Sequence, residues 1–65
     1  MGTCRFWHPE RSFGFLRVTG HADIFVPSRA VRPAREELTV GQRVRFLVRR
    51  GGDSRLFAWE VEVIE

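Results

Sequence analysis

The feature that most constrains this chain is the two-residue period of its hydrophobic side chains. Several short runs alternate apolar and polar residues, and none sustains the 3.6-residue period of an amphipathic helix. Turn-forming residues separate the runs, most clearly at 20–22 and 50–53. The alternation predicts five strands, at residues 3–7, 13–19, 23–26, 43–48 and 56–64. An all-β fold is therefore expected.

The number and shortness of these strands favour a closed barrel. An open sheet of five short strands would expose its two edges, whereas closure removes them. A sandwich would need about seven strands. We expect residues 1–65 to form one small domain, a five-stranded antiparallel OB-fold barrel. Residues 28–40 contain Pro33 and no sustained pattern, and residues 28–31 are expected to make one short helical or 3-10 turn.

The small size of the chain excludes several classes of protein. A domain of about 60 residues buries only about 60% of its unfolded surface, which leaves no room for a cofactor cleft and a catalytic apparatus, so no enzyme activity, catalytic residue or cofactor is expected. Cys4 is the single cysteine, so neither a disulfide nor a zinc site is expected. No apolar run reaches 18 residues, and the N-terminus lacks a secretion pattern. A cytoplasmic protein without membrane contact is expected, monomeric, with a homodimer as the alternative.

The charge of the chain favours an anionic partner. All 11 basic side chains are arginines, and the net charge is +3. Residues 1–35 carry six arginines and only two acids, whereas residues 36–65 carry five arginines and six acids. The guanidinium group binds phosphate in a bidentate fashion and stacks on bases. The alternative is that the exclusive use of arginine reflects genome composition.

The aromatic residues of the second and third runs are predicted to share an exposed surface. Phe13 and Phe15 alternate onto the same face as Arg17, and Phe25 shares a face with Asp23. The short loop between the runs brings the three rings together. Exposed rings surrounded by arginines are typical of a stacking site for unpaired bases, worth about 1–3 kcal/mol per base. The alternatives are rings packed inside the barrel, or a patch that contacts a second copy or another protein.

The same residues resemble the bacterial cold-shock domain. Residues 12–16 (SFGFL) and 23–26 (DIFV) resemble its motifs K-G-F-G-F-I and D-V-F-V-H. Four further segments match in order: residues 2–8 with G-x-V-K-W-F-N, 30–31 with S-A-I, 38–46 with L-x-x-G-Q-x-V-x-F, and 58–61 with A-x-N-V. The resemblance covers nearly the whole chain. It implies an OB-type barrel that binds single-stranded RNA or DNA with low sequence preference, as an RNA chaperone or a regulator of transcription or translation.

The resemblance also implies roles for individual residues. Phe6 stands where the family has an exposed tryptophan, and Phe13, Phe15 and Phe25 stand at stacking positions. Further positions that hydrogen-bond or neutralise the strand are occupied here by His8, Arg11 and Asp23. The complete predicted nucleic-acid-binding set is Arg5, Phe6, His8, Arg11, Phe13, Phe15, Asp23, Phe25 and Arg29.

The chain departs from the family pattern at several binding positions. Ser12 replaces a glycine, Pro27 replaces a histidine, Ser28 replaces an aromatic residue, and residues 32–37 contain no ring. Up to three of about seven stacking rings are missing, which would cost several orders of magnitude in affinity if nothing replaced them. The arginines expected to compensate, through phosphate contacts and stacking, are Arg29, Arg32 and Arg35. The rival hypothesis is a protein-interaction barrel that has lost nucleic-acid affinity.

The last run carries the remaining expectations. Alternation places Phe57, Trp59 and Val61 on one face and Ala58 on the other. Trp59 and Trp7 are both predicted in the core, with Trp59 alternatively covering one end of the barrel. The arginines of the fourth run are expected to face solvent, with acidic cross-strand partners among Glu60, Glu62 and Glu65.

Overall fold

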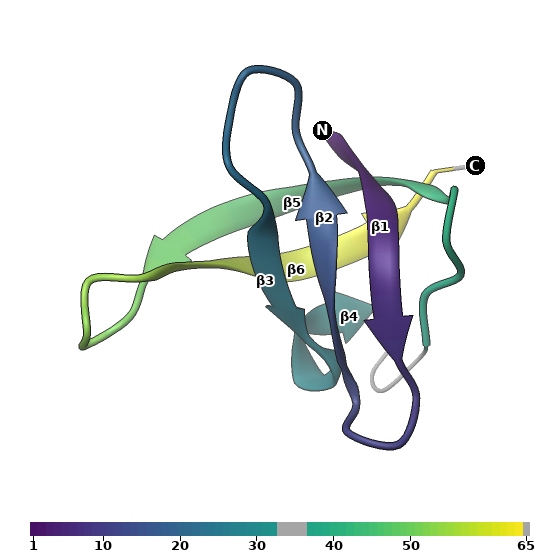
Figure 1. Cartoon of the computed structure of the whole chain (residues 1–65), viewed down its shortest axis with the longest axis horizontal. Helices are drawn as coiled ribbons and strands as arrows, with labels where there is room; N and C mark the ends of the chain where they lie inside the picture. The colour runs from purple at the N-terminus through teal and green to yellow at the C-terminus, as the bar shows by residue number, and fades with distance from the viewer. Residues whose placement is uncertain (33–36, 65) are drawn as a thin grey trace.

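The computed structural model describes residues 1–32 and 37–64 of the chain. Its strands are β1 (Gly2–His8), β2 (Phe13–Arg17), β3 (Ile24–Pro27), β4 (Val31–Arg32), β5 (Arg43–Arg50) and β6 (Leu56–Val63), and a 3-10 turn, η1 (Ser28–Ala30), precedes β4 (Figure 1). The predicted contributions of Arg35 and Glu65 lie outside the described residues.

The strands form a closed barrel. Their order is β3-β2-β1-β5-β6-β4, and β3 also pairs with β6, which closes the sheet. The pairs β1–β2, β2–β3, β1–β5 and β5–β6 are antiparallel, whereas β3–β6 and β4–β6 are parallel. The predicted all-β, five-stranded barrel is confirmed, as is the 3-10 turn at 28–30. The two-residue strand β4 is an addition that the sequence pattern did not predict.

The interior is filled by Cys4 of β1 and by aliphatic side chains from the other strands. The residues buried in this core are Cys4, Leu16, Ile24, Val26, Ala30, Val31, Leu38, Val44, Ala58 and Val61. Leu16 and Val26 are the inward members that alternation predicted for β2 and β3. Cys4 is a buried strand residue, and burial raises the pKa of its thiol above the ordinary value. Trp7 and Trp59 pack against the core but stay partly exposed, so the prediction of core tryptophans is only partly correct.

A bulge in β1 brings two consecutive side chains to the outer surface. Cys4 pairs with Leu16 and Phe6 pairs with Phe15, so Arg5 is an extra residue in β1. An extra residue interrupts the two-residue period. Cys4 therefore points into the core while both Arg5 and Phe6 are exposed. Without the bulge, Phe6 would share the inward face of Cys4.

A second bulge in β6 corrects the predicted faces of that strand. The register passes from the pair of Arg45 with Glu62 to the pair of Leu47 with Trp59, so β6 has one residue more than β5 over this stretch. Glu60 adopts a positive φ of 51° there. The prediction that Val61 lies on the face of Trp59, opposite Ala58, is wrong, because the bulge turns Val61 inward and both Ala58 and Val61 are fully buried.

The β5–β6 hairpin projects beyond the rest of the barrel (Figure 1). Leu47, Val48 and Leu56 are exposed along it. Arg45 Nε lies 2.9 Å from Glu62 Oε1, which confirms a predicted cross-strand ion pair. Within residues 1–32 and 37–64, no helix has the length and apolar character needed to cross a membrane.

Candidate nucleic-acid interface

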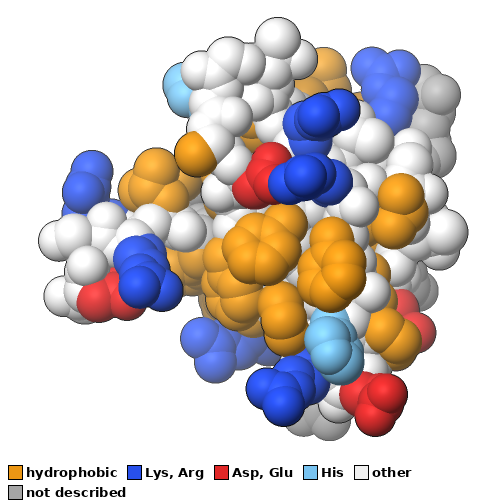
Figure 2. All heavy atoms as spheres, viewed as in Figure 1, with side chains coloured by type: hydrophobic (Ala, Val, Ile, Leu, Met, Phe, Trp, Pro, Cys, Tyr) orange, Lys and Arg blue, Asp and Glu red, His pale blue; other side chains and the backbone are white. Residues whose placement is uncertain are grey.

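Five aromatic rings gather on the outer surface of the first three strands. We call this set the aromatic platform, and its members are Phe6, His8, Phe13, Phe15 and Phe25. Neighbouring ring centroids lie 5.5 to 6.3 Å apart. Phe6 and Phe25 are 43% and 38% exposed, and Phe13 and Phe15 are half-buried between them. Figure 2 shows a group of hydrophobic side chains on this face with a histidine at its border.

The strand register explains why these rings meet. Phe6 pairs with Phe15, Phe15 pairs with Phe25, and His8 pairs with Phe13. Residues directly opposite one another on paired strands share a face of the sheet. Because each ring packs against its neighbours, the rings are held in place before any ligand arrives. The predicted outward orientation of Phe13, Phe15 and Phe25 is confirmed, and the alternative that they fill the barrel is wrong.

Gly14 allows β1 and β2 to come close beneath the platform. A Cβ atom built on Gly14 would lie 2.2 Å from the carbonyl oxygen of Phe6 and 2.6 Å from Cε3 of Trp7. Any side chain here would therefore force the strands apart. The neighbour that this glycine admits is β1.

His8 contributes its ring to the platform. Its imidazole stacks on Phe13 at 5.5 Å with an interplanar angle of 26°. Its Nδ1 atom is buried and has no hydrogen-bond partner among the described residues. The geometry adds a stacking role for His8, and its hydrogen-bonding role toward a bound strand stays a prediction.

Two of the predicted site residues bind each other. The guanidinium of Arg5 forms an ion pair with the carboxylate of Asp23. Figure 2 shows acidic and basic side chains in contact at one edge of the exposed rings. The pair cancels the local charge, and an exposed pair of this kind contributes little to stability because water and salt screen it. The charge of Arg5 is therefore partly neutralised within the protein.

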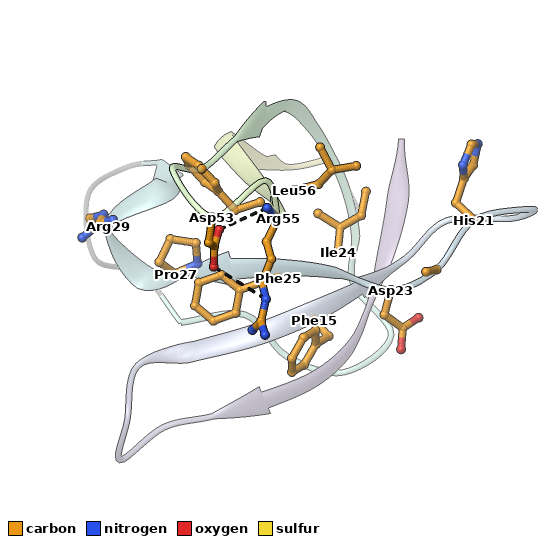
Figure 3. Close-up of a pocket in the computed structure, with 13 residues that line it drawn as sticks. Phe15, His21, Asp23, Ile24, Phe25, Pro27, Arg29, Asp53, Arg55 and Leu56 are labelled. Atoms are coloured by element: carbon orange, nitrogen blue, oxygen red, sulfur yellow. Dashed lines mark hydrogen bonds and ion pairs between the residues drawn. The ribbon is translucent and has the colours of Figure 1, made fainter.

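A groove of about 730 Å³ continues the surface from the platform to the β5–β6 hairpin (Figure 3). Phe15 and Phe25 line one side, and Leu56 and Phe57 line the other. Figure 3 shows Arg29 at one end of the groove and His21 at the other, with Arg55 beside Phe25. The remaining lining residues include Pro27 and Asp53, and Asp53 lies 3.6 Å from the Arg55 guanidinium.

Sequence reasoning missed Phe57 and Arg55 as site residues. Phe57 reaches the groove because the parallel pairing of β6 with β3 sets it beside Phe25. Arg55 follows the turn at 51–54 and is brought to the same place by the hairpin. No local pattern reports a pairing between segments 32 residues apart, so only the tertiary arrangement identifies these two residues.

The predicted arginines lie at different distances from the rings. Arg11 is exposed in the turn that joins β1 to β2, where Ser12 N donates to His8 O at 2.8 Å. Arg29 lines the groove. Arg32 does not, because its guanidinium carbon lies 5.5 Å from the centroid of Trp59, on β6. Of the arginines expected to compensate for missing rings, Arg29 alone among the described ones borders the groove.

The described residues contain no group of three or more His, Cys, Asp or Glu side chains placed to bind a metal ion. Comparison of the chain with protein-family models and with curated proteins finds no match. The class of this protein is therefore defined by its fold and by the side chains on its surface. The chain is a small closed β-barrel with an outer cluster of aromatic rings, an arrangement compatible with nucleic-acid binding by an OB fold.

Proposed function

We propose that this protein binds single-stranded RNA or DNA in the manner of a cold-shock domain. The observation that carries the proposal is the aromatic platform, since five mutually packed rings on one outer face offer stacking surfaces to successive bases. The mechanism is passive and needs no catalysis. A monomer in the cytoplasm captures unpaired segments of nucleic acid and so disfavours RNA hairpins. An RNA chaperone or a regulator of transcription or translation would act in this way.

The platform is large enough for useful affinity. A stacked base contributes about 1–3 kcal/mol, and a Kd of 1 μM corresponds to about 8 kcal/mol. Four phenylalanines and a histidine can supply that energy when phosphate contacts add to it. The arginines that support these contacts are Arg11, beside the platform strands, and Arg29 and Arg55, at the groove.

A second candidate function is protein binding by the same surface. It is favoured by Pro27, which pairs with Phe13 at a position where the resemblance expects a stacking ring. The exposed aliphatic side chains of Leu47 and Leu56 also extend the apolar surface along the hairpin. Such side chains offer no stacking face to a base.

Direct binding of an oligonucleotide separates the two functions. A labelled T-rich or U-rich strand is titrated with the protein at low salt, and its fluorescence anisotropy is followed. We expect micromolar or tighter binding, and a loss of about 100-fold in the double variant Phe13→Ala, Phe25→Ala, because each lost ring removes at least one stacking contact. Val40→Ala is the control, since Val40 is exposed outside the platform. No binding by the folded wild-type protein would favour the protein-binding module.

A further inference from the structure

Two arginines lie over the ring of Trp59, a residue of β6, which borders the groove. Arg32 of β4 places its guanidinium carbon 5.5 Å from the centroid of the Trp59 ring, and Arg49 of β5 places its own at 5.7 Å. Phe57, two residues earlier in β6, meets Trp59 edge to face at 6.1 Å. Both rings are half-buried, so part of each faces solvent. The arrangement combines stacking rings with fixed positive charge.

This second aromatic pair is continuous with the platform. Phe57 lies directly beside Phe25 where β6 pairs with β3, and both line the groove. Residues side by side on paired strands point to the same face, so the outer rings run from Phe25 through Phe57 to Trp59. Leu47, 53% exposed, pairs with Trp59 and widens the apolar surface there.

We propose that Phe57 and Trp59, with Arg32 and Arg49, form an additional stacking site for the same nucleic-acid strand, an inference that rests on the proposed function. A nucleic acid longer than the platform crosses the groove and stacks one of its bases on Trp59. The two guanidinium groups, which lie over the ring in the unliganded protein, move onto the phosphates that flank that base and leave a ring face for it. The site replaces stacking contacts that the chain lacks at Pro27 and Ser28.

The charges on β6 determine where the bound nucleic acid ends. Past Trp59, the β6 strand continues with Glu60 and Glu62. Glu62 is neutralised by Arg45 at 2.9 Å, whereas Glu60 is exposed at the bulge. An anionic strand is repelled by an exposed carboxylate. The additional site therefore holds one or two bases at the end of the nucleic acid, and the binding surface does not continue past Glu60.

Tryptophan fluorescence tests the additional site directly. The chain has two tryptophans, so the variant Trp7→Phe reports Trp59 alone. Site sizes of OB folds run from about 4 to 16 nucleotides, and oligothymidines of about 4 and about 12 nucleotides bracket the platform. We expect both strands to bind in an anisotropy titration, with strong quenching of Trp59 by the longer strand and little by the shorter one.

Truncation of the ring gives a second, independent measurement. Trp59→Ala should weaken binding of the longer strand about tenfold and leave the shorter one unchanged. Val48→Ala is the matched control, because Val48 lies on the opposite face of the hairpin, paired with Ala58. Trp59 also packs against the core, so circular dichroism verifies folding of Trp59→Ala, and the quenching experiment leaves position 59 intact.

The outcomes distinguish this inference from the proposed function. Tight binding of both strands, with no quenching of Trp59 and equal affinities for Trp59→Ala and wild type, would overturn the additional site and leave the platform as the binding surface. Absence of binding by either strand would overturn both. Quenching of Trp59 together with a length-dependent loss in Trp59→Ala would support the extended path.

Discussion

The close approach of β1 to β2 makes Gly14→Ala the most informative stability variant. The new Cβ would lie 2.2 Å from the Phe6 carbonyl oxygen and 3.2 Å from Cα of Trp7, and both are backbone atoms. No change of rotamer relieves such contacts. The Phe6 carbonyl would have to retreat by at least about 1.2 Å to reach an ordinary van der Waals distance, and that movement separates the strands that carry the platform.

The size of the effect follows from the packing. Overpacking a well-filled interior costs about 1–3 kcal/mol. In Gly14→Ala the separation of β1 from β2 would also strain the hydrogen bonds between these strands. A domain of this length has a free energy of unfolding of roughly 3–10 kcal/mol. We therefore expect Gly14→Ala to lose about 3 kcal/mol, which lowers Tm by about 15 °C for a domain of this size.

Thermal unfolding followed by far-ultraviolet circular dichroism measures this loss. Gly52→Ala is the matched control, because a Cβ on Gly52 meets nothing within 4 Å and the residue has no positive φ. The control should melt within a few degrees of wild type. If Gly14→Ala melted together with Gly52→Ala, the tight β1–β2 contact would not be the reason for the glycine.

Two further predictions follow from the backbone and the charges. Ser12 adopts a φ of 57°, so Ser12→Gly should raise the free energy of unfolding by about 0.5–1 kcal/mol, measured by chemical denaturation. The control Ser28→Gly, in the 3-10 turn, should lower it. A lower stability for Ser12→Gly would contradict backbone strain at Ser12. For a nucleic-acid strand short enough to occupy the platform alone, with about three arginines on phosphates, a plot of log K against log salt should have a slope near −2, reduced by about 0.7 in Arg29→Gln. A flat plot would refute the electrostatic contribution.

Alternation predicted the strands and the exposed rings of β2 and β3 because it persists there without interruption. Leu16 and Val26 are fully buried, and Phe15 and Phe25 face outward between them. The exposure of Phe6 came only from the resemblance, since Arg5 forms a bulge that breaks the two-residue period. A bulge is fixed by the partner strand, so the pattern of β1 alone does not reveal it.

The parts of the site that the sequence did not predict depend on contacts between distant segments. The bulge at Glu60 breaks the alternation of β6, so Val61 points inward on the side of Ala58 instead of sharing the face of Trp59. The groove arises because Phe57 lies beside Phe25, a parallel pairing between strands far apart in sequence. Hydrophobic periodicity reports which side of a strand is buried, and it carries no information on which strands become neighbours.

The closure of the barrel has a consequence for how ligand and fold depend on each other. In the described part of the chain, β3 and β6 are registered through one residue pair, Phe25 with Phe57, and the groove lies over that junction. A junction with so little backbone pairing is a natural place for local opening. If the proposed function holds, a nucleic acid bound across the groove would contact both β3 and β6 and hold them together. We expect the unliganded protein to open locally at this junction, and a ligand bound across the groove to reduce the population of the open form by mass action.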